Sequence, residues 1–417
     1  MIAEDAIEAL NAWLAKAGLR GEPEAALVSG FCQRAVVAGL PISQALVLVD
    51  TLHPVYEGRV IRWDHDSSQP AVQEYGRTHL PGEAADPHFS SGVEQTEMVA
   101  RWRASPFFRM LQTGESLLRR RLTAESEAEF PALRDYRAAG MTDYVAIINR
   151  FAPEGVIGDM DCVYFSWVTA GADGFADAHL AALTRVAPTL ALAVKAVALA
   201  RMTGTLMETH LGRDAGRRVL SGRIMRGVAD RIDAVIWFSD LRGFTRITDS
   251  APEQIIPLLN DYADVIVSVI HAQGGDVLKL IGDGILAIFA AADRAHACTA
   301  ALAAATAARR EVAALKARRA REGLPVTDMY LGLHVGEVFY GNVGSTERLD
   351  FTVLGPAVNE VSRIAAMCRS VEQPMLVSEA FANVEGMRGR LVSVGRYALR
   401  GVAQPQELFT LDWAQAR

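Results

Sequence analysis

The sequence predicts an α+β chain with two folded parts joined by a helical segment. The chain has 417 residues, more than one hydrophobic core usually organises. Strand-like apolar runs and runs with helical periodicity occur in mixed order in both halves. Between the halves, residues 202–227 combine helical apolar positions with five glycines and five arginines. These observations favour a sensor-plus-effector layout.

The composition is that of a folded protein. Hydrophobic residues make up 50% of the chain and charged residues 22%, which disfavours intrinsic disorder. The formal net charge of −7 disfavours general affinity for nucleic acid or anionic lipid. The four cysteines are scattered, so the sequence predicts buried free thiols and no disulfide scaffold or paired metal ligands.

No membrane span is expected. The most apolar helical stretch, residues 180–202, is interrupted by Arg185, Pro188 and Lys195. The N-terminus carries acidic residues where a signal peptide has a basic start and an apolar block. We therefore expect a cytoplasmic protein.

The first half contains helices and strands. Residues 1–52 are expected to form a helical N-terminal element, because apolar residues recur at helical spacing. Strand-like runs follow at 58–63, 144–148 and 161–167. A helix is expected over 106–117. The order of elements, closing with a strand, Gly174-Phe175 and a long helix, resembles GAF-like domains. The resemblance implies a sensory domain over 53–200, which receives an unidentified small-molecule or protein signal.

Residues 201–229 are expected to form a helical linker that transmits this signal. A solvated spacer has the same composition, so the sequence leaves that alternative open. The apolar residues Leu206, Leu211, Val219 and Ile224 also suit packing against the same segment of a second chain.

The first motif with chemical potential is a buried strand that ends in an acid. Residues 233–240 read DAVIWFSD and are followed by Gly243, Phe244 and Thr245. An aspartate at a strand end presents hard oxygen ligands to Mg²⁺ or Mn²⁺. The backbone N–H groups of the Gly-Phe-Thr turn are suited to phosphate oxygens. Taken alone, such an aspartate is more often a turn or cap residue.

A second motif, GDVLKLIGDGILAIF over 275–289, predicts a β-hairpin with Asp283 at its tip. Asp240 and Asp283 together are suited to a two-metal site. Asp283 is also an ordinary hairpin residue, and Lys279 is also an ordinary edge-strand lysine.

A third motif, FTVLGPAVNEVSR over 351–363, predicts a strand followed by a helix. Asn359 and Arg363 are four residues apart, hence on one helical face. An amide and a guanidinium at that spacing are suited to a ribose and a phosphate. Polar pairs of this spacing are common on helix surfaces.

The blocks FSDLRGFT, LKLIGDG and FTVLGPAVNEVSR, in this order, resemble the signature of class III adenylyl and guanylyl cyclases. The resemblance covers about 230–412 and implies a ferredoxin-like α+β catalytic domain over 230–417. It implies that Asp240 and Asp283 bind two divalent ions, Mg²⁺ or Mn²⁺. It also implies that Lys279 and Thr352 contact the purine in the adenine-selective manner, because guanylyl cyclases commonly carry Glu and Cys there.

The resemblance gives further roles to three residues. Asn359 is expected to position the ribose, and Arg363 to stabilise charge on the phosphate in the transition state. Arg400 is a loose match to a lysine that binds the terminal phosphates. The family forms head-to-tail homodimers, in which the metal-binding acids of one chain face the Lys, Thr, Asn and Arg set of the other.

The expected function is therefore an adenylate cyclase that converts ATP to 3′,5′-cyclic AMP and pyrophosphate under control of the N-terminal domain. Two alternatives remain open at this point. One is a guanylate cyclase. The other is a catalytically inert cyclase-like module that only binds a nucleotide or signal.

Overall fold

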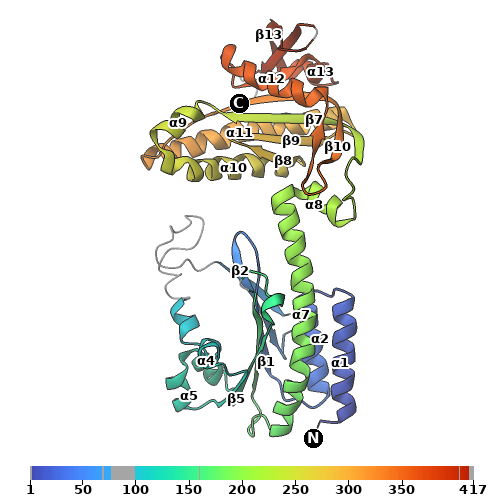
Figure 1. Cartoon of the computed structure of the whole chain (residues 1–417). Helices are drawn as coiled ribbons and strands as arrows, with labels where there is room; N and C mark the ends of the chain where they lie inside the picture. Colours follow the sequence, from blue (N-terminus) through green and yellow to red (C-terminus); the bar gives the residue numbers. More distant parts are fainter. Residues whose placement is uncertain (1, 68–69, 77–98, 159, 403, 413–417) are drawn as a thin grey trace. The chain divides into compact units, whose positions relative to one another are not determined.

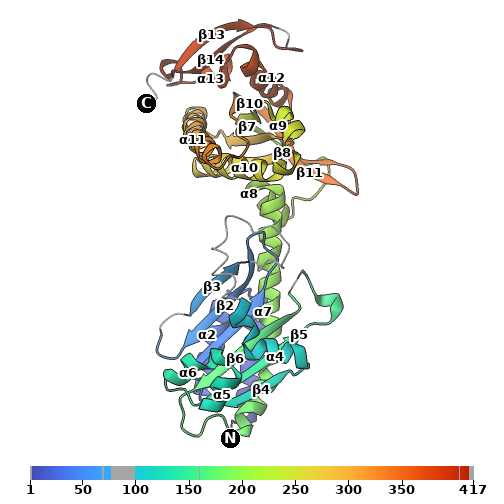
Figure 2. The ribbon, with the colours of Figure 1, turned by 90° about the vertical axis from the view of Figure 1, so that its left-hand side faces the viewer.

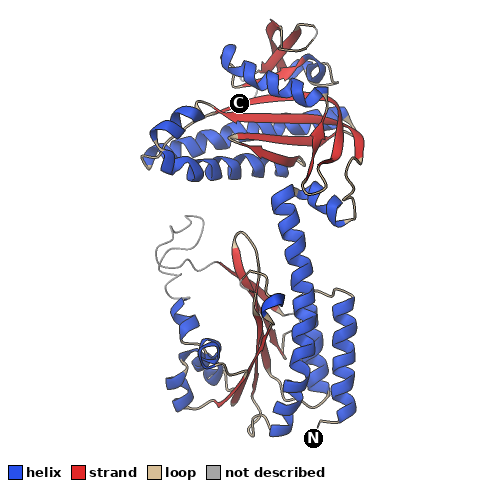
Figure 3. Cartoon of the chain, in the orientation of Figure 1, coloured by secondary structure: helices blue, strands red, loops and turns tan. Residues whose placement is uncertain are grey.

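The computed structural model describes residues 2–67, 70–76, 99–158, 160–402 and 404–412. The chain divides into two compact units, which we call the N-terminal unit (Met1–Leu206) and the C-terminal unit (Met207–Arg417). Each unit has its own sheet with helices packed on it (Figures 1 and 3). The mixed α+β class predicted from the sequence is confirmed.

The N-terminal unit contains a six-stranded antiparallel sheet of order β3-β2-β1-β6-β5-β4. Its strands are β1 (Gln44–Asp50), β2 (Tyr56–Asp64), β3 (Ala71–Gly76), β4 (Leu117–Arg121), β5 (Asp143–Arg150) and β6 (Cys162–Thr169). Its helices are α1 (Glu4–Leu19), α2 (Glu24–Val37), α4 (Pro106–Thr113), α5 (Ala124–Glu129), α6 (Arg134–Ala138) and α7 (Asp177–Leu211), which continues into the C-terminal unit.

Helices cover both faces of this sheet. Helices α1, α2 and α7 build a large apolar cluster on one face, and residues of α4 and α6 pack in a second cluster on the other (Figures 1 and 2). The central strand β6 is buried at every position, because it has strands on both sides and helices on both faces. The GAF-like identity of this unit remains a prediction.

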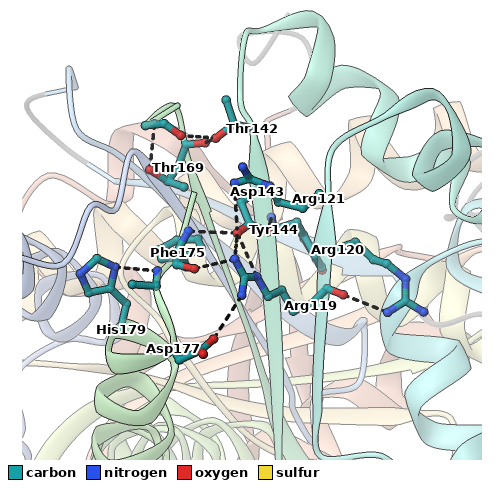
Figure 4. Close-up of polar contacts among 12 residues, drawn as sticks. Arg119, Arg120, Arg121, Thr142, Asp143, Tyr144, Thr169, Phe175, Asp177 and His179 are labelled. Carbon is teal, nitrogen blue, oxygen red and sulfur yellow. Dashed lines mark hydrogen bonds and ion pairs between the residues drawn. The ribbon is translucent and has the colours of Figure 1, made fainter. Parts of the chain in front are cut away.

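A buried carboxylate ties the start of α7 to this sheet. Asp143 is 0% exposed and accepts hydrogen bonds from Arg119 (Nη2, 2.8 Å) and from the backbone N–H groups of Phe175 (2.9 Å) and Tyr144 (3.1 Å) (Figure 4). A buried charge is tolerated when it is paired and hydrogen-bonded in this way. The cluster therefore joins β4, β5 and the turn before α7.

Two sequence predictions in this unit need correction. The predicted helical element 1–52 includes Gln44–Asp50, which is strand β1 with alternating burial. Its run QALVLVD has the period of a half-buried strand, and pairing with β2 and β6 fixes it. The helix expected over 106–117 ends at Thr113, because Gly114 adopts a left-handed conformation (φ +77°).

The predicted linker 201–229 contains the end of α7, helix α8 (Arg213–Leu220) and the first residue of β7. Leu211 and Val219, considered above for contact with a second chain, pack against an apolar cluster of the C-terminal unit. Ile224 is 58% exposed. Part of this segment thus packs against the C-terminal unit of its own chain.

Two helices, Asp177–Leu211 and the 3-10 and α-helical stretch Pro252–Ala272, are long and apolar enough to cross a membrane by length and composition. Both also contribute residues to the apolar clusters of their units. Core helices of globular proteins meet the same two criteria, so this is weak evidence for a span.

The C-terminal unit contains an eight-stranded sheet. The order along it is β13-β14-β12-β10-β7-β9-β8, and β11 pairs with β10. Its strands are β7 (Ala229–Leu241), β8 (Asp276–Ile281), β9 (Gly284–Ala290), β10 (Met329–Gly344), β11 (Leu349–Leu354), β12 (Met375–Ser378), β13 (Leu391–Tyr397) and β14 (Gln406–Leu411). Its further helices are α9 (Phe244–Ser250), α10 (Ile255–Ala272), α11 (Arg294–Arg321), α12 (Pro356–Ser370) and α13 (Glu379–Ala382).

The core of this unit has the element order β7-α10-β8-β9-α11-β10, which is the ferredoxin-like pattern predicted from the sequence. Helices α10 and α11 pack on one face of the sheet (Figure 1). Residues of α8 and α12 join an apolar cluster with β8 and β11. Strand β7 begins at Ala229, earlier than the predicted strand at 233–240, because it pairs with β10 from Ala229 to Leu241.

Candidate active site

Asp240 and Asp283 lie side by side at one end of the eight-stranded sheet of the C-terminal unit. Asp240 is near the end of β7, and Asp283 is in the two-residue turn between β8 and β9. Because β7 pairs with β9, the end of β7 lies beside the hairpin tip. The turn depends on Gly282, which has a φ of +62°. The backbone N–H of Leu241 donates to Asp283 Oδ2 at 3.2 Å, which fixes the second carboxylate next to the first.

The two carboxylates repel each other in the absence of a cation. Partial burial, together with a hydrogen bond and charge repulsion from Asp283, raises the pKa of Asp240 to about 7. A divalent cation between the two groups relieves this repulsion, and carboxylate oxygens are ligands that Mg²⁺ and Mn²⁺ prefer. The described residues contain no group of three or more His, Cys, Asp or Glu side chains suited to a metal. A pair of carboxylates fits Mg²⁺, which takes its other ligands from water and substrate phosphates.

The turn after Asp240 leads into the short helix α9. Gly243 has a φ of +69° and precedes the first helical residue, Phe244. The Phe244 side chain packs against the apolar cluster under the sheet. Thr245 is exposed, and its carbonyl oxygen accepts a hydrogen bond from Thr248 Oγ1 at 2.7 Å. If Phe244 contacts a phosphate, it therefore does so through its backbone N–H group.

Lys279 forms an ion pair with Asp350, a residue that the sequence analysis did not consider. Lys279 is in β8 and Asp350 is in β11, so the pair joins two strands far apart in sequence. Thr352 lies two residues beyond Asp350, hence on the same face of β11, and is 8% exposed. Asp350 thus brings the ammonium of Lys279 close to the strand segment that carries Thr352.

Asn359 and Arg363 lie on one face of α12, as predicted. Asn359 is exposed and Arg363 is half-buried. The Arg363 guanidinium lies against Gly401, the residue that follows Arg400 in a turn between β13 and β14. Arg400 is exposed. The structure thus brings Arg363 close to the turn that carries the most loosely matched site residue.

The predicted site residues form three local groups. They are the carboxylate pair, then Lys279 and Thr352 on strands β8 and β11, and then Arg363 with the turn that carries Arg400. Within the part of the chain that the structure describes, no hydrogen bond or ion pair joins the carboxylate pair to the other groups. Asp350 and Gly401 were missed because their roles depend on long-range contacts. The only sequence signal for Asp350 was its position two residues before Thr352, which places both residues on the same face of a strand.

The C-terminal unit matches a known family. Residues 228–412 match the model of the adenylate and guanylate cyclase catalytic domain. This stretch contains all nine candidate residues named above.

Curated relatives match part of the chain. An uncharacterized protein of Mycobacterium tuberculosis is 31% identical over 211 residues, which are 49% of this chain and 36% of the relative. Adenylate cyclase 1 of Rhizobium meliloti is 33% identical over 166 residues, which are 38% of this chain and 24% of the relative. The match thus spans about a third or less of the length of these relatives.

Solved cyclase structures are also similar. The crystal structure of the guanylyl cyclase Cya2 is 28% identical, with a TM-score of 0.40, and the similarity covers 44% of this chain and 93% of that chain. The family match leads to one conclusion: residues 228–412 belong to the family of adenylate and guanylate cyclase catalytic domains.

Proposed function

We propose that this protein is an adenylate cyclase that converts ATP to 3′,5′-cyclic AMP and pyrophosphate with two divalent metal ions. The observation that carries the proposal is the pair of adjacent carboxylates, Asp240 and Asp283, at the sheet end of a cyclase domain. Adenylate cyclases from Rhizobium meliloti and Anabaena cylindrica are among its partial relatives, at 33% and 34% identity.

The choice of ATP over GTP rests on Lys279 and Thr352. A lysine ammonium only donates hydrogen bonds, whereas a threonine hydroxyl both donates and accepts. Adenine presents an acceptor at N1 and a donor at N6 on the same edge, so the pair complements it. Guanine presents a donor at N1 and an acceptor at O6, which reverses the pattern. The ion pair with Asp350 holds the lysine side chain beside β11.

In the proposed reaction, the ribose 3′-oxygen attacks the α-phosphorus and the bond to pyrophosphate breaks, while the 3′ proton passes to solvent. The two ions, when bound, lower the pKa of the 3′-hydroxyl and neutralise the polyphosphate. Asn359 orients the ribose, and Arg363 compensates the charge that develops on the α-phosphate. Arg400 and the backbone of the turn at Phe244 and Thr245 are proposed to contact the outer phosphates.

We further propose a homodimer with composite sites. The carboxylate pair of one copy then faces Lys279, Thr352, Asn359 and Arg363 of the other. The absence of hydrogen bonds and ion pairs between these groups in the described part of one chain supports this arrangement. The N-terminal unit is proposed to regulate the site in response to a small-molecule or protein signal.

The test is a cyclase assay on the purified full chain with ATP or GTP and with Mg²⁺ or Mn²⁺. We expect cyclic AMP and pyrophosphate in equal amounts, little cyclic GMP, and no product from Asp240→Asn. Asp135→Asn, which changes an exposed carboxylate in α6, serves as the matched control and should leave the rate unchanged.

Two results would contradict the proposal, and each would favour a different function. A higher kcat/KM for GTP than for ATP would make the protein a guanylate cyclase. No product with either metal, from protein that binds ATP and forms dimers, would make the C-terminal unit an inert binding module.

A further inference from the structure

The guanidinium of Arg363 lies next to the position that a Cβ atom of residue 401 would occupy, where Gly401 has no side chain. A Cβ atom built at Gly401 falls 3.2 Å from Nη2, 3.5 Å from Cζ and 3.5 Å from Nη1 of Arg363. Three atoms of one planar group at nearly equal distance mean that the plane faces this point. A contact of 3.2 Å is tighter than nine in ten real Cβ contacts, so a side chain at position 401 forces the guanidinium to move.

The turn that carries Gly401 is anchored on the helix that carries Arg363. The backbone N–H of Val402 donates to the carbonyl of Leu399 at 3.0 Å, and Gly401 is the third residue of this turn, with a φ of +72°. Leu399 is buried and packs in one apolar cluster with Ile364, the neighbour of Arg363. The position of Gly401 relative to Arg363 is therefore fixed by core packing.

Arg363 is available to an anion. It is half-buried, and no hydrogen bond or ion pair of its guanidinium is found among the described residues. A guanidinium carries five N–H donors in a fixed plane and binds phosphate oxygens well. Because Gly401 has no side chain, the guanidinium can stack on it. The edges of the guanidinium plane, where the N–H donors lie, then remain free for such a ligand.

We propose that Gly401 is a positioning residue for Arg363, an inference that rests on the proposed cyclase function. The missing side chain at 401 lets the guanidinium stack on the turn and present its edge to the α-phosphate. An alanine there displaces the guanidinium by a few tenths of an ångström. Charge stabilisation in a transition state depends on donors held in place before the reaction, so the displacement lowers the rate.

The positive φ of residue 401 is a second reason for a glycine at this position, because other residues rarely adopt such a conformation. Gly386 provides a matched control, because it has a φ of +82° in an exposed turn of the same unit and a Cβ there meets nothing within 4 Å. Gly386→Ala thus adds the same kind of backbone strain as Gly401→Ala without touching Arg363.

The experiment measures kcat and KM for ATP in the full chain carrying Gly401→Ala or Gly386→Ala. We expect Gly401→Ala to lower kcat about ten-fold or more and to raise KM by about three-fold at most, because Arg363 acts mainly in the transition state. Gly386→Ala should match the wild type in both constants. Equal kcat values for the two variants would overturn the inference while leaving the proposed function intact.

A binding cycle tests the same inference without turnover. The probe is 3′-deoxy-ATP with Mn²⁺, which lacks the attacking hydroxyl, and the affinity is measured by calorimetry. Gly401→Ala should weaken binding about two- to three-fold in the wild-type background and have no effect in Arg363→Ala, because residues that act through each other are not additive. An equal effect in both backgrounds, or none in either, overturns the inference. A wild-type chain that binds this probe but forms no cyclic nucleotide overturns the proposed function alone.

Discussion

Asp350 shows how a single residue outside the recognised motifs supports the candidate site. Its carboxylate pairs with Lys279, and the two side chains are 43% and 36% exposed. Ion pairs with this much exposure typically contribute about 0.2–1 kcal/mol. The pair is therefore too weak to hold the fold together, but it is strong enough to bias the position of a flexible lysine.

Asp350→Asn should raise KM for ATP by up to about five-fold, the range that such an ion-pair energy allows. The measurement is steady-state kinetics on the full chain. Glu347→Gln, which changes an exposed acid in the turn before β11, is the matched control. In a Lys279→Met background the Asp350 change should have no further effect, and a full effect there would show that Asp350 acts independently of the lysine.

His334 carries a prediction about pH. It lies in β10, 6% exposed, with Nδ1 2.8 Å from Ser378 Oγ and 3.4 Å from Glu360. Burial lowers its pKa, Glu360 opposes this and Arg294 adds to it. The folded protein thus holds His334 neutral more strongly than the unfolded chain does. Its contribution to stability is complete above pH 6.5 or so and is lost as the pH falls through the lowered pKa.

We therefore expect the C-terminal unit to lose stability between pH 7 and pH 5, and His334→Gln to reduce that loss. The measurement is thermal unfolding across this pH range. Because burial also lowers the pKa of His271, His271→Gln is the parallel variant. A pH dependence that is unchanged in His334→Gln would contradict the assignment.

At the scale of elements, helix α8 packs against strands β8 and β11, which carry Lys279 and Thr352. Ala215 is 1% exposed and packs in the cluster that contains Leu278 and Phe351. Leu278 precedes Lys279, and Phe351 separates Asp350 from Thr352. The segment predicted to transmit a signal is thus in contact with the strands on which substrate choice is proposed to depend.

Ala215→Asp should destabilise the C-terminal unit by about 2 kcal/mol or more, because it buries a charge without a partner. The measurement is urea unfolding. Ala314→Asp, in an exposed part of α11, is the matched control and should have little effect. If both variants unfold at the same urea concentration, α8 is not packed on the sheet as described.

The elements that the sequence predicted well are those specified locally. The hairpin with Asp283 at its tip followed from Gly-Asp-Gly between two apolar runs, and α12 followed from Pro356 and a helical pattern. The strand β1 was missed because it directly follows two helices and was read as part of them. The partners of Lys279 and Arg363 were missed because the contacts with Asp350 and Gly401 arise only when distant segments pack together.

At the scale of the molecule, one helix belongs to both units. Helix α7 starts at the Asp143 cluster of the N-terminal unit and ends at Leu211, five residues beyond the unit boundary. We propose that the N-terminal unit regulates the C-terminal unit through this shared helix. The same proposal requires two chains, because the site residues of one chain form separate groups.

The composite site predicts complementation between inactive variants. Asp240→Ala removes a metal ligand, and Arg363→Ala removes the charge-stabilising guanidinium, so each homodimer should be inactive. A mixed dimer contains one site with both defects and one site with neither. Mixing the two variants under conditions that exchange subunits should therefore restore activity, to about a quarter of the wild-type rate if subunits combine at random, because half of the dimers then carry one intact site. A mixture of Asp240→Ala and Asp283→Ala is the control.

This control mixture should stay inactive, since both changes affect the same half of the site. No recovery in the first mixture, with subunit exchange verified by a tagged chain, would show that each chain forms its site alone.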